Sequence, residues 1–337
     1  MSSDTKNGKR TTGLVLGKFA PFHKGHQFLV EFAKVRVDKL YVLIYEARET
    51  TKIPLETRAN WIRQIYPDVT VIAGHDAPTV EGTSEQVKKT QEDYIVKMMP
   101  EPITHFFSSE WYGEHVSKAL GATNVLVDAD RKTVPVSATK VRNGEVLSHE
   151  FLHPVVNRDV VKKVLILGAE SAGKTTLARE LANKYNTTWV PEYGRDYWNE
   201  HHDDKGNLTA EQLVELAKIH RKNEEDAFSK ANHIVFVDTG ATTTRQYCKD
   251  YGYSVPMELD TLVHDERSRY DLFILCDIDI PYEDDGTRRG EIVRKETQLK
   301  IKADLIYRGI PFHTITGPLD FRLVLVENLV CGWLDIC

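Results

Sequence analysis

Two histidines near the start of the chain have the spacing of a phosphate-binding site. His23 and His26 flank Gly25 in GKFAPFHKGH, where a short apolar run gives way to helical spacing. The first turn of a helix offers unpaired N–H groups and partial positive charge, so histidines placed there can hold polyphosphate oxygens. Gly17, at the end of the apolar run, would let phosphates approach the backbone. Two solvated loop histidines are the alternative, and the surrounding residues decide between the two.

A second motif, SATKVRNG, follows at residues 137–144. Together the two motifs resemble the HxGH nucleotidyltransferase superfamily, although Val136 and Ala138 stand where that family has isoleucine and a second serine. The resemblance implies an ATP site in which Ser137 and Thr139 open a helix around the phosphates. Its other members would be Lys18, His23, His26 and Arg142, which bind the phosphates, with Gly17 and Phe19 beside them.

Such a site needs no side-chain nucleophile, because a phosphate of the substrate attacks the α-phosphorus of ATP and pyrophosphate leaves. Catalysis is then positioning and charge neutralisation by His, Lys, Arg and Mg²⁺. Residues at the ends of later strands would hold the acceptor, since ligands of open α/β sheets bind there. Trp111 would stack on a base or pyridine ring, or else pack within its own loop. The acceptor candidates are Ser108, Glu110, Trp111, Asp130 and Arg131.

The second half of the chain contains a P-loop pattern, GAESAGKT, directly after the apolar run VLIL and before a helical segment. In this pattern the backbone N–H groups wrap the phosphates, Lys174 reaches the β and γ oxygens, and Thr175 holds Mg²⁺. The predicted nucleotide-binding residues are Gly168, Glu170, Ser171, Ala172, Gly173, Thr175 and Thr176.

Acidic and basic residues further along complete a predicted kinase site. Asp238 ends the apolar run HIVFVD and is the candidate second Mg²⁺ ligand, although strands also end in Asp for capping alone. Glu192, in EYGRDY, is the candidate base for the acceptor hydroxyl, with a surface salt bridge to Arg195 as the alternative. The arginines of DGTRRGE would close over ATP, unless that segment is a charged surface loop. The acceptor candidates are Tyr193, Arg195 and Asp196, and the lid candidates are Arg288 and Arg289.

The elements that must position these residues alternate as strands and helices in both halves. Apolar runs at residues 13–17, 39–47, 69–73, 104–108 and 124–127 predict strands, with helices at 26–33, 56–66 and 84–98 between them. The second half predicts strands at 163–167, 187–190, 234–237, 272–276 and 312–315, with helices at 175–185, 209–231 and 294–307. The last helix would have Leu299, Ala303 and Ile306 on one face. The fold class is therefore α/β, with two doubly wound parallel-sheet domains.

The domain boundary is expected in SHEFLHPVVNRD, at residues 148–159, where no period is visible and Pro154 interrupts the pattern. We expect a disordered tail over residues 1–11, an adenylyltransferase domain over 12–152 and a P-loop kinase domain over 160–337. The 337 residues suffice for two domains with their own cores.

Composition excludes several classes of protein. The 41% hydrophobic and 28% charged residues are ordinary for a globular protein, and neither an 18-residue apolar run nor a secretory signal is present, so we expect a cytoplasmic protein without a membrane partner. A net charge of −6 without a basic cluster argues against a nucleic-acid partner. The four cysteines lack CxxC spacing, and we expect free thiols. A homo-oligomer stays open.

The order of motifs, from HKGH through FSSE, SATKVR, GAESAGKT and EYGRDY to FVDT and DGTR, resembles the bifunctional NadR family. The resemblance implies a nicotinamide-mononucleotide adenylyltransferase followed by a ribosylnicotinamide kinase, with ATP as co-substrate and Mg²⁺ as cofactor. Only about a dozen polar residues precede the first predicted strand, so we expect no helix-turn-helix domain and no repressor role.

Two other functions fit the same layout. One is a phosphopantetheine adenylyltransferase joined to a dephospho-CoA kinase, against which EYGRDY and DGTRR count. The other is a nucleotide sensor that binds NAD or ATP without turnover, against which the intact Lys174, Thr175, His23 and His26 count.

Overall fold

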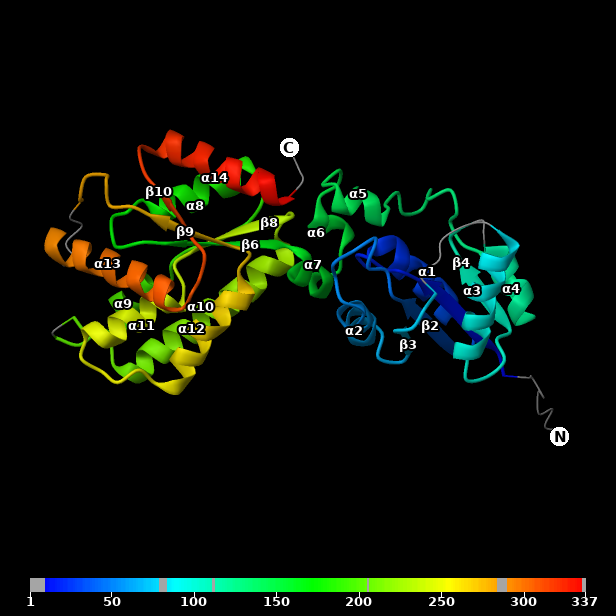
Figure 1. The fold of residues 1–337 in the computed structure, drawn as a ribbon. Coiled ribbons are helices and arrows are strands. Elements are labelled where there is room, and N and C mark those ends of the chain that lie inside the picture. Colours follow the sequence, from blue (N-terminus) through cyan, green and yellow to red (C-terminus); the bar gives the residue numbers. More distant parts are fainter. Residues whose placement is uncertain (1–9, 79–83, 111–112, 205, 284–289, 335–337) are drawn as a thin grey trace. The chain divides into compact units, whose positions relative to one another are not determined.

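The computed structural model describes residues 10–78, 84–110, 113–204, 206–283 and 290–334. The chain forms two compact units, each with its own parallel sheet (Figure 1). The first unit takes the residues up to Val146 together with Glu150–Val156, and the second takes Leu147–His149 and the residues from Asn157 onward. The two doubly wound α/β sheets predicted from the sequence are thus confirmed.

The sheet of the first unit has five parallel strands in the order β3-β2-β1-β4-β5. Strand β1 therefore lies in the middle, with β2 on one side and β4 on the other. The connections leave β1 in opposite directions, which makes its carboxyl end the switch point where ligands bind in such sheets. The strands are β1 (Thr12–Gly17), β2 (Lys39–Tyr45), β3 (Thr70–Gly74), β4 (His105–Ser108) and β5 (Thr123–Leu126).

Helices cover both faces of this sheet. Leu14, Leu43 and Phe106 face the helices α3 and α4, where they pack with Ile95 and Val116. Helices α1 and α2 pack against β1, β2 and β3 as well. The helices of this unit are α1 (Lys24–Lys34), α2 (Leu55–Ile65), α3 (Glu85–Met98), α4 (Gly113–Leu120) and α5 (Ala138–Arg142). The segment Glu150–Val156 further along the chain belongs to the same unit.

The sheet of the second unit also has five parallel strands, in the order β10-β9-β6-β8-β7. Here β6 is central, between β8 and β9, and its carboxyl end is the switch point. The strands are β6 (Lys162–Leu167), β7 (Trp189–Val190), β8 (Ile234–Asp238), β9 (Leu272–Cys276) and β10 (His313–Ile315).

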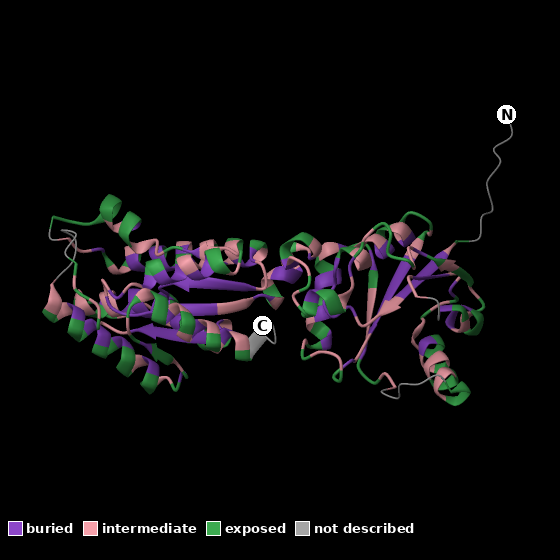
Figure 2. Ribbon diagram, turned by 90° about the horizontal axis from the view of Figure 1, so that it is seen from above, coloured by how far each residue is buried: buried purple, intermediate pink, exposed green. Residues whose placement is uncertain are grey.

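The side chains of β6 alternate between two cores, as the period of a strand requires. Val164 and Ile166 pack with residues of α8 and α14, whereas Leu165 and Leu167 pack with residues of α10 and α13. The central strands are accordingly drawn as buried in Figure 2. The helices are α8 (Lys174–Lys184), α9 (Gly194–His201), α10 (Ala210–Lys230), α11 (Ala241–Asp250), α12 (Met257–Arg269), α13 (Glu291–Tyr307) and α14 (Leu319–Leu334).

The segment in which the pattern broke is more ordered than its sequence suggested. It forms two short helices, α6 (Ser148–Phe151) and α7 (Pro154–Val160), and Pro154 is the first residue of α7. Proline suits that position because the first turn needs no N–H donor there. Helices of four and seven residues are too short to show a period, which is why the sequence analysis missed them.

The structure turns the apolar face of α13 outward and contradicts the expectation that the cysteines are free thiols. The face of α13 with Leu299 and Ile306 is exposed, at 67% and 62% of their accessible surface, while Arg294 and Gln298 on the other face are buried. These polar side chains are buried because they hydrogen-bond to the P-loop, as described below. Cys248 and Cys276 are free, but Cys331 is disulfide-bonded, a pairing that CxxC spacing does not detect. Among the described helices, none is both long and apolar enough to cross a membrane.

Candidate active sites

The first predicted site is built around the loop that joins β1 to α1. His23 is the N-cap of α1, and its Nδ1 accepts a hydrogen bond from the Gly25 amide at 3.1 Å. The His26 Nδ1 accepts in turn from the His23 amide at 3.3 Å. The two imidazoles stack, with ring centroids 3.7 Å apart. The motif therefore places both rings at the start of the helix, where unpaired N–H groups favour anions.

Both histidines are kept neutral. Burial lowers the pKa of His23 to about 4, and the Arg131 charge lowers it further in the same direction. Burial also holds the pKa of His26 well below its usual range, with the neighbouring His23 as the next cause. At neutral pH the two rings therefore act as N–H donors and not as full charges. The positive charges that act on His23 are those of Arg131 and Arg142.

The second motif of this site reaches the same loop through Arg142. Its Nη1 donates to the backbone carbonyl of Ala20, and its Nη2 donates to Thr139 Oγ1 at 3.2 Å. Ser137 is the N-cap of α5 and accepts from the Lys140 amide at 3.2 Å. The two motifs predicted to share a site, separated widely in the sequence, are thus joined by a direct hydrogen bond.

Lys18 and Phe19 complete the loop, and the Phe19 ring lies where a side chain at position 17 would be. The Lys18 Nζ donates to Thr50 Oγ1 at 2.9 Å. The Phe19 ring is buried, lies edge-on to His26 and covers Gly17, where an added Cβ would lie 3.1 Å from the ring. In this structure the space beside Gly17 is filled by an aromatic ring.

The acceptor candidates of the first unit separate into two groups. Ser108, at the end of β4, is buried and donates through Oγ to the Glu110 carbonyl at 2.8 Å. The Glu110 carboxylate pairs with Arg131 at 3.2 Å, and the influence of Arg131 on both histidine pKa values places its charge beside them. Asp130 is exposed and pairs instead with Lys132. Trp111 lies outside the described residues.

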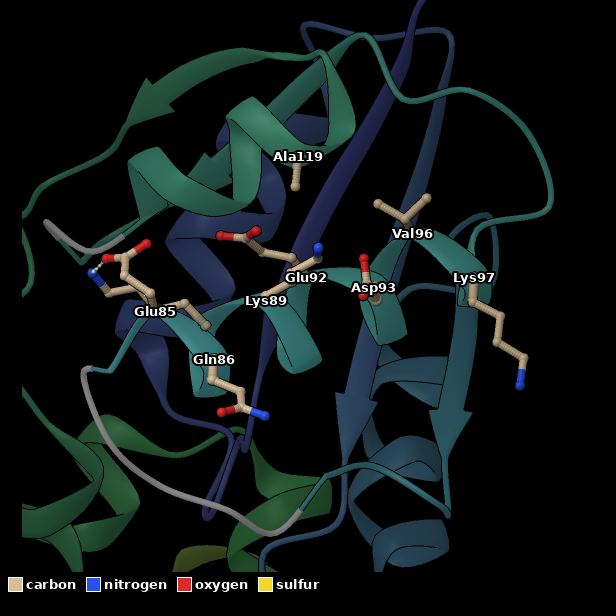
Figure 3. Close-up of a pocket in the computed structure, with 9 residues that line it drawn as sticks. Glu85, Gln86, Lys89, Glu92, Asp93, Val96, Lys97 and Ala119 are labelled. Carbon is tan, nitrogen blue, oxygen red and sulfur yellow. Dashed lines mark hydrogen bonds and ion pairs between the residues drawn. The ribbon is translucent and has the colours of Figure 1, made fainter.

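A cavity of about 140 Å³ opens beside Lys18 at the carboxyl ends of β1 and β2. Its floor is apolar, with Leu43 and Val116 among its members, and its rim carries Tyr45, Glu46 and His115. A larger open depression lies elsewhere, between α3 and α4, and is lined mostly by charged side chains (Figure 3). None of the predicted site residues lines that depression.

Sequence analysis missed two residues that shape the first site. Asp128 has φ +47° and accepts hydrogen bonds from the Lys132, Thr133 and Val134 amides, which fixes the loop that carries Arg131. Arg58, on α2, is fully buried and donates to the backbone carbonyl of Lys18. The acid directly after a strand was a signal for Asp128, whereas nothing local distinguishes Arg58 from a surface arginine of a helix.

The second predicted site is the P-loop between β6 and α8. Gly168 has φ +146°, and an added Cβ would lie 2.7 Å from the Cys276 carbonyl, so only glycine fits there. Lys174 is buried as the first residue of α8, and its Nζ donates to the Ala169 carbonyl at 3.0 Å. Ser171 has φ +58° within the loop, Glu170 is half-buried, and Thr176 is exposed on α8.

Thr175 and Asp238 meet as the sequence analysis expected of a metal site. The Thr175 Oγ1 donates to Asp238 Oδ2 at 2.5 Å. Burial raises the pKa of Asp238 to about 6, Lys174 opposes this shift, and Glu192 adds to it. A hydroxyl and a carboxylate are hard oxygen ligands of the kind that Mg²⁺ selects, so these two residues fit that ion. Across the described residues no cluster of three or more His, Cys, Asp or Glu side chains suits a metal.

Glu192 follows β7 and lies close enough to Asp238 to raise its pKa. Tyr193, the N-cap of α9, packs edge-on against Tyr197, and Arg195 and Asp196 are exposed in the first turn of α9. The structure thus brings Glu192 to the P-loop side of the sheet. Arg288 and Arg289 lie outside the described residues.

Comparison with known proteins agrees with this division. Residues 14–144 match the cytidylyltransferase-like family and residues 163–322 match an AAA domain family. A trifunctional NAD biosynthesis/regulator protein NadR of Escherichia coli is 31% identical over 314 residues, covering 86% of this chain and 75% of that protein. The protein of the same name from Salmonella typhimurium is 29% identical, covering 96% and 83%.

Two solved structures share the fold over nearly the whole chain. A NadR protein in complex with NR has a TM-score of 0.66 at 23% identity and covers 97% of both chains. A NadR protein in complex with NAD and AMP-PNP has a TM-score of 0.65 at 22% identity, covering 98% of this chain and 97% of that one. The order of the two units, the motifs in each and the identity to the Escherichia coli protein together show that this chain belongs to the NadR family.

Proposed function

We propose that this chain makes NAD in two ATP-dependent steps, one in each unit. The second unit phosphorylates nicotinamide riboside to nicotinamide mononucleotide, and the first joins the mononucleotide to the adenylyl group of ATP. The observation that supports this most is that the residues predicted to bind phosphate lie at the switch point of each sheet: the stacked His23 and His26 after β1, and Lys174 with Thr175 after β6. The protein's place in the NadR family supplies the identity of the riboside.

In the kinase step the riboside hydroxyl attacks the γ-phosphorus of ATP and ADP leaves. Glu192 is the proposed acceptor of the hydroxyl proton, because it is the carboxylate beside Asp238 that is not hydrogen-bonded to Thr175. Lys174 neutralises the transferring phosphoryl group. Thr175 and Asp238 would hold Mg²⁺, which neutralises charge on the phosphates when bound. Arg288 and Arg289 are proposed to act over ATP in the same step.

In the adenylyl transfer step a phosphate oxygen of the mononucleotide attacks the α-phosphorus of ATP, and pyrophosphate leaves. His23 and His26 are neutral and donate N–H hydrogen bonds to the phosphates, while Lys18 and Arg142 supply the charge. The cavity beside Lys18 is proposed to take the pyridine ring of the mononucleotide, since Leu43 and Val116 in its lining suit an aromatic ring and Lys18 also lines it. Glu110 and Arg131 would hold the acceptor from the β4 side.

The test is a chromatographic assay of the purified chain with Mg·ATP and nicotinamide riboside. The riboside should disappear, the mononucleotide should rise and fall, and NAD should accumulate. Consumption of pantetheine phosphate without consumption of riboside would overturn the proposal in favour of the coenzyme A pathway. Binding of both nucleotides without any turnover would favour a sensor.

Two variants test the division of labour. Lys174→Ala should lose riboside phosphorylation but still convert supplied mononucleotide to NAD, and His23→Ala should stop at the mononucleotide. His75→Ala is the matched control, since His75 is largely exposed and its Nε2 contacts Glu56, which belongs to neither motif. If either site variant abolished both steps while remaining folded, the assignment of one step to each unit would be wrong.

A further inference from the structure

Two buried arginines from the end of the chain hold the back of the P-loop. Arg294, on α13, is 1% exposed and its Nη2 donates to the Ser171 carbonyl at 3.2 Å. Arg322, on α14, is 2% exposed and its Nη1 donates to the Ala172 carbonyl at 2.6 Å. These are consecutive carbonyls of the loop, and the arginines reach them from helices more than a hundred residues further along the chain.

Each arginine also holds the loop after β9. Arg294 Nη2 donates to the Ile280 carbonyl at 2.9 Å, and Arg322 Nη2 donates to the Asp277 carbonyl at 3.0 Å. Arg322 Nε donates further to the Gly317 carbonyl at 2.7 Å, just before α14. A planar guanidinium presents five donors in a rigid fork and can hold separated carbonyls in one fixed arrangement, whereas a lysine ammonium concentrates three rotatable donors on one atom.

Because of the geometry of the peptide bond, the hydrogen bonds to the Ser171 and Ala172 carbonyls also orient the amides that follow them. In a trans peptide the C=O of one residue and the N–H of the next point in opposite directions. Holding the Ser171 and Ala172 carbonyls on the arginines therefore directs the amides of Ala172 and Gly173 away from them. Within the described part of the chain neither of these amides has an acceptor.

A third contact from α13 anchors the start of the same loop. Gln298 lies one helical turn after Arg294, and its Oε1 accepts from the Ala169 amide at 2.9 Å while its Nε2 donates to the Cys276 carbonyl at 2.9 Å. The first half of the buried face of α13 thus fits the backbone of the P-loop, whereas Ile301 and Leu305, further along the same face, pack in an apolar core. This explains why polar residues take the side of the helix that faces inward.

The charges of the two arginines are partly balanced nearby. Arg322 pairs with Asp279, and Arg294 pairs with Glu291 at 3.1 Å. A buried guanidinium with these partners costs less than an unpaired one, and the two carboxylates offset part of the positive charge behind the loop. Their main effect is on the orientation of the loop.

Resting on the proposed kinase function, we propose that Arg294 and Arg322 are positioning residues for phosphoryl transfer. They fix the peptide planes of Ser171, Ala172 and Gly173 so that two amides are presented to the phosphates of ATP before ATP binds. Preorganised amides cost no reorganisation when the nucleotide arrives.

Arg322→Lys and Arg294→Lys test this proposal, with Arg308→Lys as the matched control. Arg308 has a side chain that is only 8% exposed, and it donates to the Val263 carbonyl and to Asp304, away from the P-loop. We expect each P-loop variant to raise the KM for ATP in the kinase step by roughly tenfold, the effect of misplacing charge-assisted hydrogen bonds. The KM for the riboside and the rate of adenylyl transfer from supplied mononucleotide should stay within about twofold in the same variants.

Direct binding separates this proposal from the proposed function. In calorimetric titrations with Mg·ADP, the binding component that is lost in Lys174→Ala is assigned to the P-loop. That component should weaken roughly tenfold in Arg322→Lys and Arg294→Lys but not in Arg308→Lys. A wild-type chain that binds Mg·ADP in this way but leaves the riboside unchanged would overturn the kinase function and leave the role of the arginines standing.

A purely structural role predicts a different pattern. The thermal midpoint would fall in all three variants, while the KM for ATP and the affinity for Mg·ADP stayed at wild-type values, and this result would overturn the proposal. If the arginine variants do not fold, Asp279→Asn takes their place, because Asp279 is one-third exposed and holds Arg322 without contacting the loop. A raised KM for ATP in Asp279→Asn would support the proposal, and an unchanged KM would contradict it.

Discussion

Thr175 Oγ1 donates a hydrogen bond of 2.5 Å to Asp238 Oδ2, which joins the first turn of α8 to the end of β8. The carboxylate is fully buried beneath the P-loop, with Lys174 and Glu192 as its charged neighbours. A buried carboxylate costs stability when it ionises, unless a cation or hydrogen-bond donors offset that cost. Ionised Asp238 therefore lowers the stability of the second unit, at the position where the proposed metal site needs a negative charge.

Asp238→Asn should make the metal-free protein more stable while removing riboside phosphorylation. Because burial raises the pKa of Asp238 to about 6, the folded state holds this proton more tightly than the unfolded chain does. Wild-type stability should thus fall, relative to the variant, as the pH rises from about 4 to 6, and the difference should then level off at roughly 3 kcal/mol. Thermal or urea unfolding in EDTA across this pH range measures the difference.

Mg·ADP provides the control for Asp238. It should stabilise the wild type more than Asp238→Asn, because the ion would bind the carboxylate that the variant lacks. Equal stability of the two proteins at pH 5 and pH 8 would show that Asp238 is not penalised by burial.

The first unit should lose stability as the pH falls from about 6.5 to 4. Burial lowers the pKa of His23 to about 4 and also lowers that of His26, so the folded state resists protons that the unfolded chain accepts. The contribution of the two neutral histidines to the free energy of unfolding is complete above about pH 6.5, the pKa of histidine in the unfolded chain. It is lost as the pH falls from there toward about 4. His23→Asn keeps an N-cap side chain but removes one titrating group, and its unfolding midpoint should depend less steeply on pH. A slope equal to that of the wild type would contradict the inference, and His75→Asn serves as the exposed control.

Glu192→Gln tests the proposed base of the kinase step. We expect kcat for riboside phosphorylation to fall roughly 10²–10⁴-fold while the KM for ATP changes little, because the carboxylate acts on the acceptor and not on the nucleotide. Steady-state kinetics with each substrate varied in turn gives both constants. Glu200→Gln, on the exposed part of α9, is the matched control. A kcat within about tenfold of the wild type would limit Glu192 to orienting the riboside.

The sequence predicted those parts of the fold and sites that depend on local pattern. The two sheets follow from apolar runs, and Lys174, Thr175 and Asp238 meet because a P-loop and a strand-end acid sit on neighbouring strands of a parallel sheet. Arg294 and Arg322 could not be found in this way. From sequence alone, an arginine in a helix is expected at the surface. The burial of these two arginines depends on carbonyl groups of the P-loop, which lies far away in the chain.

The same limit applies to Gly17 and to the exposed face of α13. The sequence indicated that glycine leaves room for a phosphate, but it did not show that a side chain at Gly17 would meet the Phe19 ring, whose position depends on the turn between β1 and α1. The sequence placed Leu299 and Ile306 on one face of α13 but did not show that this face is exposed, because the side that contacts the P-loop needs donors and acceptors. Hydrophobic period alone does not show which face a helix turns toward a polar loop.

Asp128→Ala should weaken adenylyl transfer without contacting the phosphates. The Asp128 carboxylate accepts from three amides of its own loop, at 2.9, 3.0 and 3.1 Å, and these hydrogen bonds lower its pKa. The loop carries Arg131, whose charge lowers the pKa of His23. Without the carboxylate the loop should move, the pKa of His23 should rise, and the rate should fall roughly tenfold. Titration of the imidazole signals by NMR and an assay with supplied mononucleotide measure the two effects.

Asp128→Asn separates loop geometry from charge. An asparagine keeps the oxygen that accepts from Lys132 and Thr133 and loses only the acceptor for Val134, so most of the rate and the low pKa of His23 should return. Riboside phosphorylation should be unchanged in both variants, because Asp128 belongs to the first unit. If Asp128→Ala left the imidazole titration and the adenylyl transfer rate at their wild-type values, the loop would not depend on this carboxylate, and Arg131 would owe its position to Glu110 alone.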